Sequence, residues 1–444
     1  HRDLHSFPTR RSSDLCNIEF ENAYSNPAAY GQGLYLNDEK IENLVIPESV
    51  NEIKNYAFCN NSAIKAVKFN YALQGIGTEA FNGCSGLTSV TVPGNVTAIG
   101  DNAFASTNVK DLTFAYGASP VEIGEGAFVA PESLSWDRPV ESLNLDVNSL
   151  VSLTIGNSLT EIPDGRFKKI TTLAALNLGN GLVSVGDEAF IGCTGLTEVI
   201  LPPSAETIGA SAFAGNTKLT SIVMGHNVRT IGAKAYDLCP AQKVCITAQT
   251  PPDAPDNTFS NYTGSLYVQG QKALDAYYEA DYCWYQFEGH ALIEPTELKI
   301  DGEKTITGKA GDAFQLTATL YPEDVTLPQI FWRSTNPDIA VVDQNGLVTV
   351  RAGKDDVMAM AEDGDSSANS CKIIAESLYA NGPVAEVSVN ASSAGVDEIT
   401  DNSTPGEIDY NAPVEVYNLQ GVKVATTVDN LTAGIYIVRQ GNNV

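Results

Sequence analysis

The chain repeats itself at an interval of about 23 residues, and this period limits its fold more than any other feature. The leading apolar residues of successive copies are Ile53, Ile76, Ile99, Ile123, Ile162, Val185, Ile208 and Ile231. The clearest copies read IGTEAF at 76–81, IGDNAF at 99–104, IGEGAF at 123–128, VGDEAF at 185–190, IGASAF at 208–213 and IGAKAY at 231–236. Their spacing is nearly constant except for one long step, from Ile123 to Ile162, whose additional residues lie between Phe128 and Leu150.

One unit, residues 76–98, predicts a short strand followed by a stop. Leu87, Val90 and Val92 form an apolar, β-branched stretch that ends at Pro93. The Ala-Phe element beside its glycines predicts a helical or 3₁₀ turn. A single unit cannot bury its apolar side, whereas stacked units can. We therefore expect a mainly β fold with short helical turns, in which the units wind into a right-handed solenoid.

The aromatic residue of each copy is expected to stack on its equivalents in one buried column. Its members are Phe58, Phe81, Phe104, Phe128, Phe167, Phe190 and Phe213. A second buried ladder is predicted eight residues after the leading apolar residue, where small, weakly polar side chains tie down the backbone of the turn. This position holds Cys84, Cys193 and Cys239, and in other copies Asn61 and Asn216.

The pattern LxxVxVPxxVxxIGxxAFxxC resembles the BspA-like, or Treponema-type, leucine-rich repeat family. The resemblance covers roughly residues 41–290. It implies that the strands line the concave side of the solenoid and that the protein belongs to the bacterial surface, where members of the family are implicated in adhesion to host matrix proteins and to other cells. We assign residues 16–292 to the solenoid, with a C-terminal cap that includes an aromatic-rich helix over 273–287.

A second domain is predicted over residues 293–375. Short alternating strands separated by turn signals such as Asn345-Gly346 favour a β-sandwich. The run FWRSTNPDIAVVDQNGLVTV at 331–350 resembles the bacterial Ig-like group 2 domain, which implies that Trp332 is central to its core. In that family the domain is usually a spacer or adhesive module of surface proteins.

The remaining segments carry weaker signals. Residues 376–411 contain seven acidic residues and no Lys or Arg, which predicts a solvated linker. Residues 412–444 resemble the start of the C-terminal sorting module of the type IX secretion system, without its expected final strand. Residues 1–15 have no apolar core of a signal peptide, fit no later pattern and are interpreted as a non-native segment.

The charge balance narrows the class of partner. The chain has 26 Lys and Arg against 54 Asp and Glu, a net charge of −28. Such a surface repels phosphate backbones and anionic lipid, and no apolar run is long enough to span a bilayer. No phosphate loop, metal motif or nucleophile elbow is present, so we expect no enzyme, no cofactor and no metal site. The sequence does not decide whether two of Cys239, Cys245 and Cys283 form a disulfide.

Any binding site is expected on the outward positions of the strands. With Val90 and Val92 buried, Thr91 points away from the core. The candidate ligand-binding column is Lys68, Thr91, Thr113, Thr154, Asn177, Ile200 and Val223. The column is polar and small at first, and Ile200 with Val223 forms an apolar spot further on. The alternative is that these residues only satisfy β-propensity.

The function expected is that of a non-enzymatic, secreted or cell-surface protein whose export signal is not present in this chain. Its partner is then a host extracellular-matrix or cell-surface protein, bound through the repeat array. The alternative is a glycan-binding accessory protein of a polysaccharide-utilisation system. The sequence does not name the ligand or the oligomeric state.

Overall fold

The structure is a computed structural model of the chain. It describes residues 16–351 and 370–391, with gaps at 19, 27–34, 37–38, 140–142, 261–263 and 281, and three strands at 415–417, 423–425 and 437–439. The chain divides into two compact units, His1–Ala394 and Gly395–Val444. The segment predicted to be non-native, 1–15, lies outside the described residues.

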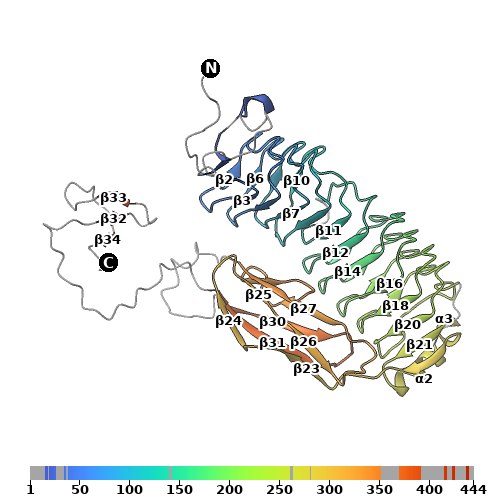
Figure 1. The fold of residues 1–444 in the computed structure, drawn as a ribbon. Coiled ribbons are helices and arrows are strands. Elements are labelled where there is room, and N and C mark those ends of the chain that lie inside the picture. Colours follow the sequence, from blue (N-terminus) through green and yellow to red (C-terminus); the bar gives the residue numbers. More distant parts are fainter. Residues whose placement is uncertain are drawn as a thin grey trace, which may run out of the picture. The chain divides into compact units, whose positions relative to one another are not determined.

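Residues 35–291 of the first unit hold a repeat array in which long and short strands alternate as far as Ile231, except for two consecutive long strands in the long step (Figure 1). The long strands have three or four residues: β3 (Asn43–Val45), β5 (Ala66–Lys68), β7 (Ser89–Val92), β9 (Asp111–Phe114), β11 (Ser133–Trp136), β12 (Ser152–Ile155), β14 (Ala175–Leu178), β16 (Glu198–Ile200), β18 (Ser221–Met224), β20 (Lys243–Ile246), β21 (Ser265–Val268) and β22 (Glu288–Ala291). The short strands have two: β4 (Glu52–Ile53), β6 (Gly75–Ile76), β8 (Ala98–Ile99), β10 (Glu122–Ile123), β13 (Glu161–Ile162), β15 (Ser184–Val185), β17 (Thr207–Ile208) and β19 (Thr230–Ile231). Before them, β1 (Tyr35–Leu36) and β2 (Glu39–Lys40) pair antiparallel.

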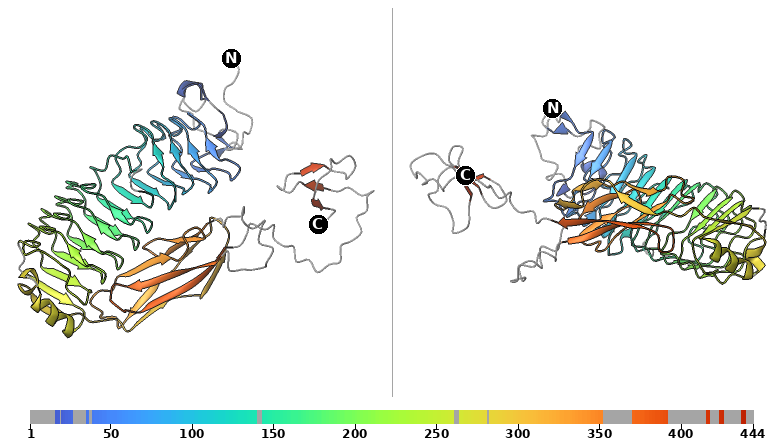
Figure 2. Two further views of the ribbon diagram at one scale, coloured as in Figure 1. Left: turned by 180° about the vertical axis from the view of Figure 1, so that it is seen from behind. Right: turned by 90° about the horizontal axis from the view of Figure 1, so that it is seen from below.

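Strands of successive coils pair in parallel and in register, as the repeat predicts (Figure 2). The long strands form sheets in the orders β3-β5, β14-β12-β11-β9-β7 and β16-β18-β20-β21-β22, and the short strands form β10-β8-β6-β4 and β13-β15-β17-β19. Backbone groups are satisfied between coils: the amide of Gly100 donates to the carbonyl of Ile76 at 2.8 Å. Stacking therefore supplies the hydrogen bonds that one coil cannot make alone.

The Ala-Phe segments are hydrogen-bonded turns, whereas the sequence predicted helical or 3₁₀ turns. Turns of this kind contain a residue in the left-handed region, such as Glu79 at φ 52° and Asn102 at φ 54°. The amide of Phe81 then donates to Ala103 of the next coil at 2.7 Å, not along its own chain. The helices described are η1 (Ala23–Ser25) before the array and α2 (Gln271–Glu279) and α3 (Tyr282–Tyr285) in the cap.

The phenylalanines stack in two runs, where the sequence predicted one column. Ring centroids of successive members from Phe58 to Phe128 are 4.8–5.1 Å apart, and those from Phe167 through Tyr236 to Phe259 are 5.3–5.5 Å apart. Within the described part of the chain no stacking joins Phe128 to Phe167. The cap closes the second run, where Trp284 and Phe287 meet Phe259 edge-on.

The interruption coincides with the long step in the repeat. This step contains an additional long strand, β11, whose Ser133 pairs with Ser152 of β12 less than one repeat period later. The short coil, residues 133–151, thus has a long strand but no short strand among its described residues. Arg138, which is fully buried, donates to the carbonyls of Ala115 and Val96, each at 3.0 Å, and so ties the short coil to the coils before it.

An Ig-like β domain follows the array. Its strands are β23 (Glu297–Ile300), β24 (Thr305–Gly308), β25 (Ala313–Gln315), β26 (Ala318–Tyr321), β27 (Ile330–Ser334), β28 (Ala340–Val342), β29 (Leu347–Val350), β30 (Ser370–Ser377) and β31 (Val384–Ala391). They form sheets in the orders β23-β26, β24-β31-β30-β27 and β25-β29-β28, and Trp332 is buried in the core, as expected.

The boundary predicted for this domain is corrected by the structure. The sequence assigned residues 376–411 to an acidic linker, yet β30 continues to Ser377 and β31 pairs with both β30 and β24. The sandwich therefore extends to Ala391. In the second unit, within the segment 412–444, β32 (Glu415–Tyr417) pairs antiparallel with β33 (Lys423–Ala425) and β34 (Ile437–Arg439).

Candidate functional site

The predicted ligand-binding residues occupy one outward position of successive long strands. Pairing places Thr91, Thr113, Thr154 and Asn177 in one continuous row of the five-stranded sheet. Lys68 lies at the same position of β5, and Ile200 with Val223 continues the row in the next sheet. Ser135, which the repeat spacing does not reveal, stands between Thr113 and Thr154 because the short coil supplies a strand of its own.

The two ends of this row have different surroundings. Lys68, Thr91 and Asn177 are exposed, and Thr113 and Thr154 are partly exposed. Val223 is only 2% exposed and Cys245, its neighbour in register, is fully buried. Both belong to the apolar core of the Ig-like domain, and Ile200 and Tyr267 pack against that core. The apolar spot that the sequence offered as ligand surface is thus covered by the chain itself.

Hydrogen bonds fix the Ig-like domain to the turns that follow the long strands. After β12, the side-chain amide of Asn157 donates to the carbonyls of Trp332 at 3.0 Å and Val342 at 2.9 Å. Its carbonyl oxygen accepts from the Gln344 amide at 2.5 Å. One turn further, the Asn180 amide donates to the Glu376 carboxylate. These two asparagines thus join the turns of the array to strand and loop groups of the sandwich.

The same row of turns continues the contact toward the cap. The hydroxyl of Thr247 donates to the carbonyl of Leu378 at 2.7 Å, and Nδ1 of His226 lies 3.1 Å from the same oxygen. Gln269 and Ala380 exchange two hydrogen bonds, both 2.9 Å long. His226 is therefore part of an interface inside the first unit.

Earlier coils contact the domain through one arginine. The guanidinium of Arg351 lies 4.6 Å from the ring centroid of Tyr116, in cation–π geometry. Burial raises the pKa of the nearby Asp137 carboxyl, while hydrogen bonds from Ser158 and the charges of Arg351 and Arg138 act in the opposite direction. Burial also lowers the pKa of Arg138 to about 10. The Ig-like domain thus contacts coils on both sides of the short coil.

The cysteine ladder is structural. The thiols of Cys84, Cys193 and Cys239 each donate to the carbonyl of the phenylalanine one coil earlier, at 3.1 Å, and the Asn216 amide does the same at 3.2 Å. This confirms the predicted ladder. Burial raises the pKa of Cys84 and Cys239 to about 12, so these thiols stay protonated and unreactive. Among the described cysteines, no disulfide joins Cys239, Cys245 and Cys283.

The uncovered part of the row offers hydroxyl, amide and ammonium groups on a regular sheet. Such groups donate and accept hydrogen bonds but form no catalytic constellation, and that the chain is not an enzyme stays a prediction. Within the described ranges, no cluster of three or more His, Cys, Asp or Glu could hold a metal ion. Over these same ranges, no helix combines the length and hydropathy needed for a membrane span.

Comparison with known proteins identifies both domains. Residues 29–135 and 145–264, just over half of the chain, match the BspA-type leucine-rich repeat region in six copies. Residues 298–372 match the bacterial Ig-like domain of group 2. An uncharacterized protein of Clostridium acetobutylicum is 28% identical over 111 residues, which are 25% of this chain and 26% of that protein.

Solved structures similar to part of the chain include two leucine-rich repeat proteins of bacteria. A leucine-rich repeat protein from Bacteroides ovatus is 24% identical, with a TM-score of 0.29 over 46% of this chain and 60% of its own. A leucine-rich cell surface protein from Faecalibacterium prausnitzii is 18% identical, with a TM-score of 0.24 over 54% of this chain and 82% of its own. The chain thus spans about a quarter of the curated relative and three fifths of the first structure.

The family match agrees with the geometry of the array. The matched residues contain the stacked phenylalanines, the parallel strands and the cysteine ladder. Membership of this family supports a role in protein–protein interaction. The chain belongs to the family of proteins with BspA-type leucine-rich repeats.

Proposed function

We propose that this chain is a secreted or surface-attached protein that binds another protein through the uncovered part of its long-strand face. The free strand face is defined by Lys68, Thr91, Thr113, Ser135, Thr154 and Asn177. Its support is one observation: the Ig-like domain covers the apolar part of the row at Val223 and leaves the polar part open. Beside the polar part the domain contacts the turns at Tyr116, Asn157 and Asn180, and the outward strand residues Thr113, Thr154 and Asn177 stay exposed or partly exposed.

The area of the free strand face limits how strongly one copy of the chain can bind a partner. From β7 to β14 the sheet has five strands, so it measures roughly 19 Å across the strands and 13 Å along them. That area is well below the roughly 800 Å² that each partner buries in a stable complex. We therefore expect weak binding by one copy, with flanking turns contributing, and strong attachment only when many copies on a surface act together.

Adhesion to a host extracellular-matrix or cell-surface protein is the role we favour. The alternative is capture of a glycan, which the row of hydroxyls from Thr91 to Thr154 could hydrogen-bond. Sugar rings usually also stack on aromatic side chains, and the long-strand face carries such rings at Tyr267 and His290, beyond the covered Val223. This placement favours a protein partner.

The test uses the full chain, because the array and the Ig-like domain share a core. The chain is immobilised and exposed to fibronectin, fibrinogen, starch and xylan, with binding followed by surface plasmon resonance. Thr91→Arg places a bulky charge on the free strand face. Thr97→Arg makes the same change at an exposed threonine on the short-strand side of the same coil, and serves as the control.

We expect binding to a protein ligand that Thr91→Arg weakens about tenfold or more and Thr97→Arg leaves unchanged. Binding to the polysaccharides alone would favour the glycan alternative. Equal effects of the two variants would contradict the assignment to the long-strand face.

A further inference from the structure

The Ig-like domain is the covalent link between the repeat array and the C-terminal part of the chain. The array ends with β22, and residues 292–296 lead from it into β23. The chain leaves the domain at the end of β31, and the second unit begins at Gly395. A pull between a partner bound to the array and the residues beyond 391 therefore passes through this domain.

The strand at the exit, β31, is an inner strand of its sheet. The sheet has the order β24-β31-β30-β27, so β31 has a hydrogen-bonded neighbour on each side (Figure 1). It pairs in parallel with β24 from Ser388 to Ala391, and antiparallel with β30 from Val384 to Asn390. The amide of Ser388 also donates to the carbonyl of Lys304, just before β24, at 3.0 Å. Removing β31 therefore breaks pairing on both of its sides.

The parallel pairing of β24 and β31 decides how a pull acts on them. The array precedes the N-terminal end of β24, whereas the second unit follows the C-terminal end of β31. Because parallel strands point the same way, these two ends lie at opposite ends of the ladder. Tension between them slides the strands past each other lengthwise, and the hydrogen bonds across the ladder carry the load together. Strands that are pulled apart from one end would instead lose these bonds one at a time.

Buried side chains hold β31 in register. Val387 and Val389 are 2% and 0% exposed, and they alternate with residues that are exposed or partly exposed. Ile306 of β24, opposite Val389, is buried as well, and all three belong to the core of the domain. A slip by one residue would turn the buried valines away from this core, because side chains alternate along a strand. We therefore expect β31 to resist sliding until several contacts break at once.

The array also holds the turn between β30 and β31. In this turn, Ala380 exchanges two hydrogen bonds with Gln269 of the array. The hydroxyl of Tyr379, which is buried, donates to the carbonyl of Ile293 at 2.9 Å and accepts from the amide of Leu327 at 3.0 Å. Ile293 lies on the segment that joins the array to the domain. The turn is thus fixed at the end of the hairpin opposite to the exit of the chain.

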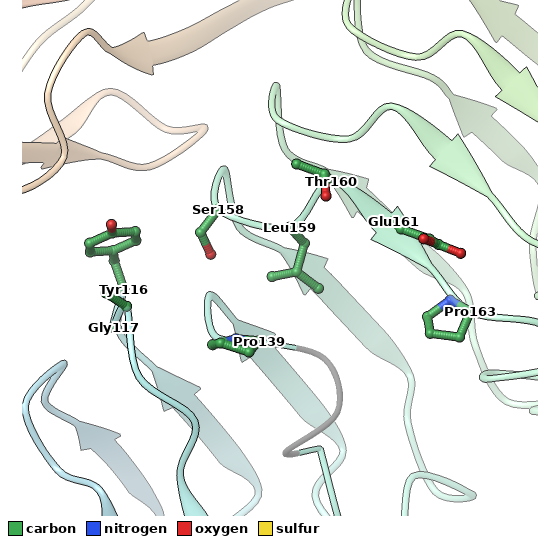
Figure 3. Close-up of a pocket in the computed structure, with 9 residues that line it drawn as sticks. Tyr116, Gly117, Pro139, Ser158, Leu159, Thr160, Glu161 and Pro163 are labelled. Carbon is green, nitrogen blue, oxygen red and sulfur yellow. The ribbon is translucent and has the colours of Figure 1, made fainter.

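The earlier coils hold the side of the domain through isolated contacts. Arg351 reaches them through its cation–π contact with Tyr116. Tyr116 stands with Ser158 and Leu159 at a cavity of about 600 Å³, so this contact is bordered by a cavity and not only by packed side chains (Figure 3). Asn157 adds hydrogen bonds from a single turn. We expect these contacts to separate under a smaller load than β31, which leaves the load on the ladder between β24 and β31.

The array itself is loaded in a different way. Its coils are joined by hydrogen bonds between equivalent strands, such as the bond from the amide of Gly100 to the carbonyl of Ile76. These bonds point along the stack of coils, so a pull on the first coil detaches the coils one after another. The array is therefore expected to unravel at a smaller force than the Ig-like domain.

We propose that the Ig-like domain is the mechanically strong link of this protein, because β31 is held lengthwise between β24 and β30. Its use in a cell rests on the proposed attachment to a surface and the proposed binding of a partner. The mechanical resistance of the domain does not depend on either of them, so it is tested without a ligand.

The test compares two directions of pull on the full chain by single-molecule force spectroscopy. All eight cysteines are buried, so added cysteines can be attached selectively to the handles. Gly395→Cys is one attachment point in both cases. With Lys304→Cys as the other, the pull slides β31 along β24, whereas with Ser370→Cys it opens the β30–β31 hairpin from its open end.

We expect sliding to need roughly twice the force of opening or more, because its hydrogen bonds break together. Val389→Ala, on β31, is expected to lower the sliding force. Val342→Ala makes the same change at a buried valine of β28, which lies in another sheet. This control is expected to lower the urea midpoint by a similar amount and the sliding force clearly less.

Two results would overturn the proposal: equal forces for the two directions, and an equal effect of Val389→Ala and Val342→Ala on the sliding force. The comparison of directions keeps the test decisive if a valine variant fails to fold, because it leaves the core of the domain unchanged. A domain that resists sliding in a chain that binds none of the tested ligands would contradict the proposed function alone. A domain that slides easily in a chain that does bind would contradict the present proposal alone.

Discussion

Replacing Gly100 by alanine tests whether successive coils touch through their backbones. A Cβ on Gly100 would lie 2.4 Å from the nitrogen and 2.7 Å from the Cα of Thr78. Both are backbone atoms of a coil that is hydrogen-bonded to its neighbours, so neither can move alone. Overpacking of this kind costs about 3 kcal/mol, and the reduced freedom of the unfolded chain returns about 0.4–1 kcal/mol. We expect a net loss of about 2 kcal/mol in the free energy of unfolding.

Lys54 supplies the matched control. It occupies the same place in the first copy, where a full side chain is already accommodated. Lys54→Ala removes an exposed ion pair with Glu52, 2.5 Å long. Such pairs contribute about 0–1 kcal/mol. Alanine at this repeat position is therefore expected to leave stability nearly unchanged in the coil of Lys54 and to lower it in the coil of Gly100.

The assay is urea unfolding of the full chain, followed by tryptophan fluorescence and circular dichroism. The three tryptophans report on different places: Trp136 in the short coil, Trp284 in the cap and Trp332 in the Ig-like domain. With an m-value of about 3 kcal/mol/M, the Gly100→Ala midpoint falls by about 0.7 M. A Gly100→Ala midpoint equal to that of Lys54→Ala would refute the argument that backbone contact excludes a side chain here.

Three substitutions test the packing further. Phe104→Ala removes a buried ring that is stacked on both sides and is expected to lower the free energy of unfolding by about 3–5 kcal/mol. Phe128→Ala, at the half-buried end of its run, is expected to lower it clearly less, and equal urea midpoints for the two variants would contradict this difference. Asn157→Ala removes three hydrogen bonds to the Ig-like domain and is expected to lower the free energy of unfolding by about 2–3 kcal/mol. Amide hydrogen exchange around Gln344 is expected to become faster, and an unchanged rate there would contradict the interface. Burial raises the pKa of the Cys84 thiol to about 12 in the folded protein. The protonated thiol therefore contributes its full stability below the pKa of an unfolded cysteine, about 8.5, and this contribution is lost as the pH rises from there toward the pKa of the folded protein. In Cys84→Ala, the urea midpoint is expected to fall less steeply over this pH interval than in the unchanged chain.

Much of the array could be predicted from sequence because a repeat fixes contacts by symmetry. Once one coil is known to stack on its equivalent, every Ile, Phe and Cys of the repeat has a known neighbour in the next coil. The stacked rings of Phe81 and Phe104 and the bond from Cys84 to Phe58 illustrate this. The same symmetry hid the short coil, because the extra residues carry a long strand without the Ala-Phe signal that marks a unit.

The position of the Ig-like domain could not be predicted from local patterns. Its contacts join residues far apart in sequence, such as Asn157 with Val342 and Gln269 with Ala380. Asparagine in a turn after a strand is common, and nothing in the pattern of one chain distinguishes a turn that contacts water from one that contacts a second domain. The acidic composition after residue 376 similarly outweighed the strand pattern of Val384–Ala391.

At the apolar end of the strand row, residue type indicates that a contact exists but does not indicate the partner. Ile200 and Val223 form an apolar spot on an outward face, and apolar clusters of this kind mark a contact. The contact is with another part of the same chain, so the feature that suggested a ligand site instead marks where a ligand is excluded. The polar positions from Lys68 to Asn177 gain their functional interest from this, since the domain that covers Val223 contacts the turns at Asn157 and Asn180 but leaves the outward strand positions exposed or partly exposed. A binding surface on this array is therefore defined by which strand positions the Ig-like domain leaves uncovered, and not by the repeat pattern alone.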